Sequence, residues 1–312
     1  MEGRREKPDG GPRTRRVPDA DYPARLRELS SPPDPLFLAG RWDHPGPHVA
    51  IVGSRSATED GLDVARELAA ALCGRGAAIV SGLAQGIDAA AHEGALGAGG
   101  LTGAVLGTPL DQIYPPEHAS LQDRVARSLG LMSEIPVHAN ASRNTFASRN
   151  RMVAAIADAV VVVQGRMGSG AGITAKYAAR LGRPVAALPW DSRDPLGEMP
   201  HDLIRTGKAT LVRNAADVLE LIGIGDTTPQ RVAPNPDAIP PNLTSHETAL
   251  YRALRGRPLP LDQLAASASL TASELSIALI ALELRGLARR SPGGLAQRTS
   301  GVRVAREAHA ER

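Results

Sequence analysis

Short runs of apolar residues alternate with amphipathic segments from about residue 45 to residue 222. Residues 49–52 are all apolar and are followed by Gly53, and leucine and alanine then recur at helical spacing through residues 59–72. The same alternation predicts strands over 49–52, 77–80, 102–106, 131–134, 159–163, 184–188 and 209–212. It predicts helices over 59–72, 87–96, 117–129, 148–157, 173–181 and 215–222. Because apolar strands that alternate with helices form parallel sheets covered on both faces, we expect an extended Rossmann-type α/β domain with a mostly parallel sheet.

The segments on either side of this domain differ from it in composition. Residues 1–20 are rich in Gly, Pro, Asp and Arg, which predicts a disordered basic arm. Residues 21–42 combine spaced leucines with prolines, and we expect an ordered lead-in that packs on the Rossmann-type domain and extends it to residues 21–222. Residues 223–242 carry five prolines and are predicted to be a linker.

Residues 243–298 predict a small second domain. Helices are expected over 245–254, 261–266 and 273–284, and the last of them follows Thr271-Ala272-Ser273-Glu274, which has the spacing of a capping box. Residues 286–290, the turn Pro292-Gly293-Gly294 and the residues after it predict a hairpin. Three helices and a hairpin make a small C-terminal winged helix-turn-helix domain. Residues 299–312 are predicted to be a flexible tail.

Composition narrows the class of protein. The 312 residues are 42% hydrophobic, enough for a sizeable core, and the longest apolar run, 159–163, is far shorter than the ~20 residues of a membrane helix. The basic residues near the N-terminus are not followed by an apolar stretch, so we expect a cytoplasmic protein without a secretory signal. The single cysteine, Cys73, excludes an internal disulfide, and no metal or other cofactor is expected. The net charge of +3 is compatible with a nucleic-acid partner.

Four loops that follow predicted strands or open predicted helices carry the candidate chemistry, because ligands of open parallel sheets bind at the carboxyl ends of the strands. They are Gly53-Ser54-Arg55, Ser81-Gly82-Leu83-Ala84-Gln85-Gly86-Ile87-Asp88, Phe146-Ala147-Ser148-Arg149-Asn150-Arg151, and Arg166-Met167-Gly168-Ser169-Gly170-Ala171-Gly172-Ile173-Thr174-Ala175-Lys176. Glycines before a helix, backbone N–H groups and arginine forks all suit phosphate. The first loop lacks G-x-G-x-x-G and the fourth lacks the Walker A pattern, so neither a dinucleotide site nor ATP hydrolysis is predicted.

The residue types in these loops favour binding over catalysis. Residues 164–183 contain no Asp or Glu, while positive charge comes from Arg166, Lys176, Arg180 and Arg183. Asp88 and His92 lie four residues apart on one helix face, and two interpretations remain open. They form a catalytic pair, or Asp88 caps the helix or orients an arginine while His92 is a structural histidine. Phe146 either stacks on a base or packs in the core.

Taken together, the motifs resemble the DNA-processing protein A family, also called DprA or Smf. The resemblance runs over most of the chain. It is carried by Val52-Gly53-Ser54-Arg55, Ser81-Gly82-Leu83-Ala84-Gln85-Gly86-Ile87-Asp88, Tyr114-Pro115, Ser133-Glu134, Arg149-Asn150-Arg151 and Ser169-Gly170 with Ile173-Thr174-Ala175. Residues 243–298 are similar to the winged-helix domain that often closes these proteins.

This resemblance implies a non-catalytic protein that binds single-stranded DNA, protects incoming strands and helps to load the recombinase RecA during natural transformation and recombination. It also implies a homodimer that forms through the Rossmann-type domain. The family's basic DNA pocket corresponds here to phosphate contacts from Arg55, Arg149, Arg151 and Lys176. The full set of expected DNA-binding residues is Gly53, Ser54, Arg55, Ser81, Gly82, Gly86, Phe146, Arg149, Asn150, Arg151, Ser169, Gly170, Thr174 and Lys176.

Two alternative functions are compatible with parts of the sequence. Rossmann-type enzymes that cleave nucleoside monophosphates at the glycosidic bond share a glycine-rich loop with a threonine, but they place a glutamate where this chain has Lys176. A winged-helix transcription regulator would use residues 273–284 as its recognition helix. That segment is mostly apolar or acidic, which suits a major groove poorly.

Overall fold

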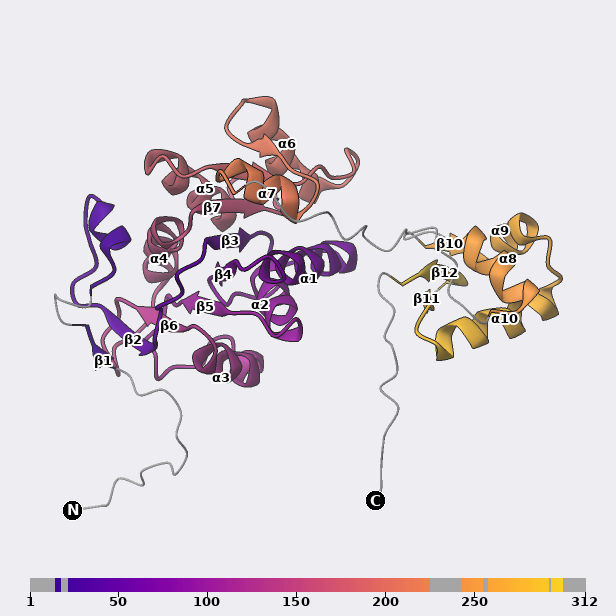
Figure 1. Ribbon diagram of the computed structural model, residues 1–312, viewed down its shortest axis with the longest axis horizontal. Helices are drawn as coiled ribbons and strands as arrows, with labels where there is room; N and C mark the ends of the chain where they lie inside the picture. The colour runs from indigo at the N-terminus through magenta and orange to yellow at the C-terminus, as the bar shows by residue number, and fades with distance from the viewer. Residues whose placement is uncertain (1–14, 18–21, 225–242, 255–257, 292, 300–312) are drawn as a thin grey trace, which may run out of the picture. The chain divides into compact units, whose positions relative to one another are not determined.

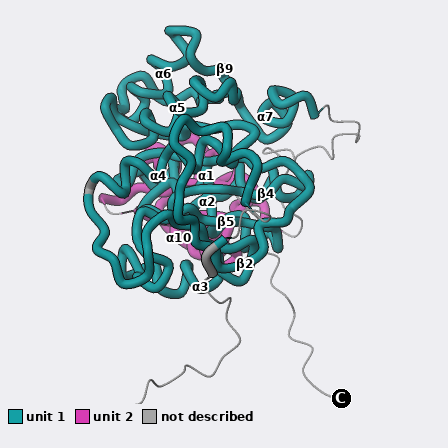
Figure 2. Tube along the Cα trace, turned by 90° about the vertical axis from the view of Figure 1, so that its left-hand side faces the viewer, with its two compact units in different colours: residues 1–227 teal, residues 228–312 magenta. Residues whose placement is uncertain are grey.

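The computed structural model describes residues 15–17, 22–224, 243–254, 258–291 and 293–299. The chain divides into two compact units, Met1–Thr227 and Thr228–Arg312, which Figure 2 shows in different colours. The division falls inside the segment that the sequence predicts to be a linker.

The first unit is built on one sheet (Figure 1). Its strands in the described residues are β1 (Arg15–Arg16), β2 (Phe37–Gly40), β3 (His48–Val52), β4 (Ala78–Ser81), β5 (Thr102–Val105), β6 (Gly130–Ser133), β7 (Ala159–Val162), β8 (Val185–Ala187) and β9 (Thr210–Leu211). They lie in the order β1-β2-β6-β5-β4-β3-β7-β8-β9. Strands β3 to β9 run parallel, whereas β2 is antiparallel to β6 and β1 is antiparallel to β2. The chain order therefore reverses between β3 and β7, the position where such sheets bind ligands.

Helices cover both faces of this sheet, as the fully apolar strands predict. They are α1 (Glu59–Cys73), α2 (Ile87–Gly97), α3 (Ala119–Arg127), α4 (Arg143–Ile156), α5 (Gly170–Arg180), α6 (Glu198–Arg205) and α7 (Ala215–Leu221), with the short 3-10 helices η2 (Ala24–Glu28), η3 (Pro116–His118) and η4 (Pro195–Gly197). Alternate residues of β3 point to opposite faces. Ala50 and Val52 pack with α4 and α5, while Val49 and Ile51 pack with α1, α2 and α7.

Two of the differences from the boundaries predicted from the sequence change the architecture or the site. Within the predicted disordered arm, Arg15 and Arg16 pair with β2, and Val17 is buried in the core beneath it; the other residues of that arm lie outside the described part of the chain. Helix α4 begins five residues earlier than predicted because Ser142 and Thr145 form a capping box. A threonine at that position lacks the Glu or Gln that marks such a box in a sequence.

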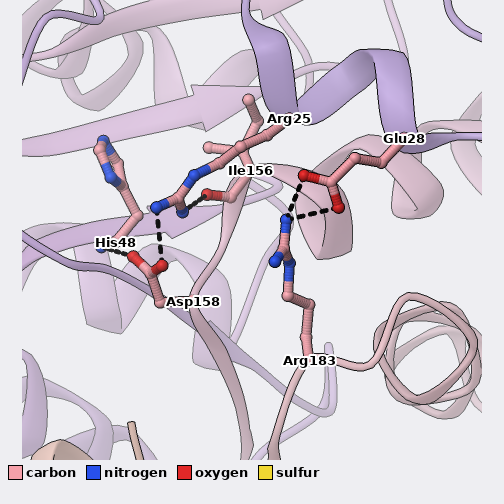
Figure 3. Close-up of polar contacts among 6 residues, drawn as sticks. All are labelled: Arg25, Glu28, His48, Ile156, Asp158 and Arg183. Atoms are coloured by element: carbon pink, nitrogen blue, oxygen red, sulfur yellow. Dashed lines mark hydrogen bonds and ion pairs between the residues drawn. The ribbon is translucent and has the colours of Figure 1, made fainter. Parts of the chain in front are cut away.

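The lead-in segment is held to the amino-terminal side of the sheet by side-chain contacts that Figure 3 shows. The Arg25 guanidinium donates to the carbonyl oxygen of Ile156 and to the Asp158 carboxylate, each at 2.7 Å. The second oxygen of Asp158 accepts the backbone N–H of His48 at 2.8 Å. Arg183 forms an ion pair with Glu28 at 2.9 Å. These contacts join the lead-in to the residues that precede β7 and β8 and, through Asp158, to the first residue of β3.

The second unit is a winged helix. It contains α8 (Ser245–Ala253), α9 (Leu261–Ala268), α10 (Ala272–Leu284) and a sheet of β10 (Leu259–Pro260), β12 (Leu295–Arg298) and β11 (Ala288–Ser291). Its core is built around Leu250, Leu264 and Leu279. The predicted capping box at Thr271 and Glu274 is present. Within the described residues, no single helix is long and apolar enough to span a membrane; only α9 and α10 together, across a bend of 101°, reach that length and composition.

Candidate functional site

A cavity of about 570 Å³ opens at the carboxyl ends of β3, β4 and β7, where the strand order reverses. Its walls come from the loops after these strands, from α4 and from the first turn of α5. Ten of the fourteen residues predicted to bind DNA line it: Gly53, Ser54, Arg55, Gly82, Phe146, Arg149, Asn150, Ser169, Gly170 and Thr174. Segments far apart in the sequence thus meet at one site, which the sheet order makes possible.

The loop after β3 places Arg55 at the rim of the cavity. The Ser54 N–H donates to the carbonyl oxygen of Gln164 at 2.8 Å, which ties this loop to the end of β7. The Arg55 side chain is exposed and also lines a second, smaller cavity of about 80 Å³ beside the first. Gly86 packs directly against the backbone of this loop. A side chain at position 86 would collide with the backbone of Ser54 and Arg55, and the φ of +79° at Gly86 also favours glycine. Gly86 is therefore a packing residue beside the cavity.

Arg149 lies in the floor of the cavity and is buried, with 4% of its surface exposed. One guanidinium nitrogen donates to the carbonyl oxygen of Val105 at 2.5 Å, and its Nε has no hydrogen-bond partner. Burial lowers the pKa of Arg149 from its ordinary value, and the nearby Asp88 opposes that shift. Burial likewise raises the pKa of Asp88, and the attraction of Arg149 lowers it again. The two charges are therefore coupled beneath the cavity.

Asp88 and His92 do not form a catalytic pair in the structure. Asp88 accepts the N–H of Gly82 at 3.1 Å, whereas Nδ1 of His92 bonds Oγ1 of Thr102 at 2.7 Å. His92 is fully buried, and burial, followed by the charges of Arg149 and His118, lowers its pKa to about 3. A neutral histidine held against a threonine in the core has a structural role.

Four predicted residues lie outside the cavity lining. Ser81 is buried and donates to the carbonyl oxygen of Ile51 at 2.7 Å, and Gly86 packs behind the Arg55 loop. Arg151 forms an ion pair with Glu134 at 2.5 Å, and both side chains are mostly buried, with 15% and 17% exposed. Lys176 is exposed on α5, six residues after the helix begins. The geometry therefore does not place Arg151 or Lys176 against a ligand in this cavity.

Arg166 also lines the cavity, although the sequence analysis named it only as a source of positive charge and not among the expected DNA-binding residues. It follows β7, its side chain is exposed, and it lines the cavity close to the first turn of α5. Its position in a glycine-rich loop at a strand end was the available signal. Ser169 forms no side-chain cap on α5, and the N-terminus of this helix presents a positive dipole end, which suits an anion.

Phe146 is half-exposed and forms part of the wall that the two cavities share. Its ring lies 5.0 Å from the ring of Tyr114, measured between centroids and at an angle of 49°. Tyr114 is 47% exposed and lines the smaller cavity. The cationic cavity therefore has an aromatic pair at its edge, which is compatible with either interpretation of Phe146.

Comparison with known proteins gives a consistent result. The DNA recombination-mediator protein A family matches residues 14–223, and the DprA winged helix domain matches residues 234–294. A DprA relative from Mycobacterium tuberculosis is 40% identical over 275 residues, which cover 86% of this chain and 70% of that protein.

Solved structures that resemble this chain include two of DNA processing protein A. DNA processing protein A from Streptococcus pneumoniae is 38% identical, with a TM-score of 0.63 over 67% of this chain and 74% of its own. DNA processing protein A from Helicobacter pylori, described with its single-stranded DNA binding mode, is 28% identical, with a TM-score of 0.61 over 66% of this chain and 94% of its own. The chain therefore belongs to the DNA recombination-mediator protein A family, the family of the DprA and Smf proteins.

Proposed function

We propose that the chain binds single-stranded DNA in the cavity at the end of β3, β4 and β7. The observation that carries this proposal is the meeting of Arg55 and Arg166, two exposed guanidinium groups from different strand ends, in one cavity at the N-terminus of α5. Guanidinium forks and helix N-termini both bind phosphate. The Helicobacter pylori relative is described as binding single-stranded DNA, which supports the same ligand class here.

The proposed ligand is the sugar–phosphate backbone with little base specificity. A flexible single strand can bend its phosphates into a concave site, whereas a stiff duplex cannot follow a cavity of this size. The Tyr114–Phe146 pair offers a surface on which one base could stack. Lys176 remains a proposed contact, which Lys176→Ala tests in the same binding assay, whereas the ion pair with Glu134 gives Arg151 a structural role.

The proposed role is that of a recombination mediator without catalytic activity. The two carboxylates that line the cavity are engaged by the protein itself: Asp88 accepts the Gly82 N–H, and Asp194 accepts the Leu196 N–H and the Trp190 indole N–H. Neither is arranged as an acid–base partner for a substrate. On this proposal the protein protects incoming strands, loads the recombinase RecA on them in natural transformation, and forms a homodimer through its Rossmann-type unit in the cytoplasm.

The test is a binding titration with a fluorescent oligothymidine, repeated at several salt concentrations. Arg55→Ala and Arg166→Ala are each expected to weaken binding and to reduce the slope of log K against log salt by about 0.7, the value for one phosphate contact on a single strand. Arg180→Ala, which removes an exposed arginine at the other end of α5, is the matched control and should bind like the wild type. Wild-type binding by both cavity variants would show that the site is elsewhere.

A further inference from the structure

The loop between β3 and α1, residues 53–58, carries Arg55 and is bonded at both of its ends to one residue, Gln164. At the start of the loop, the Ser54 N–H donates to the carbonyl oxygen of Gln164 at 2.8 Å. At its end, the Thr58 N–H donates to Oε1 of Gln164 at 3.1 Å, and Nε2 of Gln164 donates to Oγ1 of Thr58 at 2.9 Å. The backbone of Gln164 therefore holds one end of the loop and its side chain holds the other.

Gln164 is itself fixed in the core. It lies two residues after β7, its side chain is 0% exposed, and it does not line the cavity. Its amide occupies the space where a side chain at Gly61 would begin, in the first turn of α1. Oγ1 of Thr58, which this amide contacts, also accepts the Gly61 N–H at 3.1 Å. Because another rotamer of Gln164 would leave buried polar atoms without partners, the amide is held in one orientation.

The charges around the cavity explain why the loop has to be held. Burial lowers the pKa of Arg149 most, Asp88 raises it, and the charge of Arg55 lowers it further, so the guanidinium groups of Arg149 and Arg55 interact. Arg166 adds a third guanidinium group to the same cavity. Like charges repel one another, and a loosely held loop would move Arg55 away from the other two. A loop that is already in place spares DNA the cost of ordering it.

We propose that Gln164 is a positioning residue for DNA binding, which holds Arg55 at the rim of the cavity without touching DNA itself. The inference rests on the proposed function, because it takes Arg55 to contact a phosphate. Loss of the Gln164 amide should lower the affinity for DNA but leave the number of phosphate contacts unchanged, since Arg55 is still present. The salt slope should therefore stay that of the wild type. We expect affinity to fall about tenfold, the cost of fixing the backbone of about one residue.

Substitutions on three sides of this contact test the proposal in the full-length protein. Gln164→Leu removes the amide, Thr58→Ala removes the hydroxyl that it contacts, and Gly61→Ala displaces the amide without changing either partner. Each should weaken the binding of a fluorescent oligothymidine with the salt slope unchanged, whereas Thr58→Ser keeps the hydroxyl and should bind like the wild type. Alanine favours a helix over glycine, so weaker binding by Gly61→Ala does not come from a weaker α1. Gly97→Ala makes the same exchange in open space on α2 and should bind like the wild type.

A double-mutant cycle and amide hydrogen exchange separate positioning from a general loss of stability. In an Arg55→Ala background, Gln164→Leu should weaken binding no further, because the loop no longer carries the side chain that Gln164 positions. Exchange over residues 53–61 of the free protein should be faster in Gln164→Leu, and DNA should slow it again. Thr102→Val removes a buried hydrogen bond to the Ile79 carbonyl oxygen at the start of β5 and should leave DNA binding unchanged.

The outcomes distinguish this inference from the proposed function. If Arg55→Ala weakens binding but Gln164→Leu and Gly61→Ala bind like the wild type, Gln164 does not position Arg55 and the inference alone fails. If Arg55→Ala also binds like the wild type, the proposed DNA site is wrong and the inference fails with it. An equal loss of affinity from Gln164→Leu with and without Arg55 would show that the glutamine acts through the fold as a whole, which would also overturn the inference.

Discussion

The guanidinium group of Arg149 occupies the space where a side chain at Gly82 would begin. A β-carbon built on Gly82 falls well inside van der Waals contact with the Arg149 guanidinium. The Gly82 N–H is at the same time bonded to Asp88, and Arg149 reaches across to the backbone of Val105. The ends of β4 and β5 and the helix α4 are thus fixed at one point beneath the cavity. The glycine after β4 is required by this packing, a role that the sequence analysis did not separate from anion binding.

Gly82→Ala should therefore damage both stability and DNA binding. Arg149 must move, and its hydrogen bond to the Val105 carbonyl then breaks. The buried Arg149 guanidinium and the buried Asp88 carboxylate also lose the attraction between their opposite charges. We expect a loss of about 2–3 kcal/mol in the free energy of unfolding, together with weaker oligonucleotide binding. Urea unfolding and the fluorescence titration measure the two effects. Gly97→Ala, in open space at the end of α2, is the control and should be neutral; an equally small effect at Gly82 would contradict the packing argument.

Alanine substitutions at Arg151 and Arg55 should have different effects, the first on the stability of the protein and the second on its binding of DNA. Removing Arg151 leaves the mostly buried carboxylate of Glu134 without its ion-pair partner, for which a loss of about 3 kcal/mol is typical. Arg151→Ala should thus lower the melting temperature by several degrees and leave the salt slope of DNA binding unchanged. Arg55→Ala, at an exposed position, should leave the melting temperature unchanged and reduce the salt slope of DNA binding. A reduced salt slope for Arg151→Ala would contradict this assignment and support the direct phosphate contact that the sequence predicts for Arg151.

Stability should fall as the pH drops below about 6.5. Burial is the largest cause that lowers the pKa of His92 to about 3 and of His48 to about 4, so both remain neutral in the folded protein. The unfolded chain binds protons at these histidines from about pH 6.5 downward, so the free energy of unfolding rises with pH across this window and is fully present above it.

Each histidine contributes a slope of at most about 1.4 kcal/mol per pH unit. Urea unfolding between pH 4 and 7.5 should show this slope. The slope should be shallower in His92→Asn, in which the amide can still bond Thr102. An identical slope in the wild type and in His92→Asn would refute the assignment.

The contact in Figure 3 between Arg25 and the residues around Asp158 should hold the lead-in segment in place. Arg25→Ala removes hydrogen bonds to the Ile156 carbonyl and to Asp158, but the pair is partly exposed and Asp158 keeps the His48 N–H. We expect a loss of about 1–2 kcal/mol in the free energy of unfolding. Limited proteolysis should then cut the lead-in first. Arg25→Lys keeps the positive charge but cannot donate to both acceptors as the guanidinium does, so its loss of stability should lie between zero and that of Arg25→Ala. If the lead-in of both variants resists the protease as well as that of the wild type, Arg25 does not have this role.

The order of strands and helices in the Rossmann-type unit could be predicted from the sequence because that information is local. An apolar run of four or five residues followed by helical spacing describes one strand and one helix without reference to the rest of the chain. The capping box at Thr271 was visible for the same reason, whereas the box at Ser142 was missed because Thr145 replaces the usual acidic partner.

The glycine-rich loops at the strand ends were also identified from the sequence, since glycine and a following helix mark an anion site by themselves. Which cations face that site depended on the tertiary structure. The pairing of Arg151 with Glu134, the burial of Arg149 against Gly82 and the presence of Arg166 beside Arg55 all join residues from different strand ends. The sheet order that places β7 next to β3 decides those meetings, because a charged side chain is directed by the neighbours that the fold supplies and not by the residues beside it in the chain.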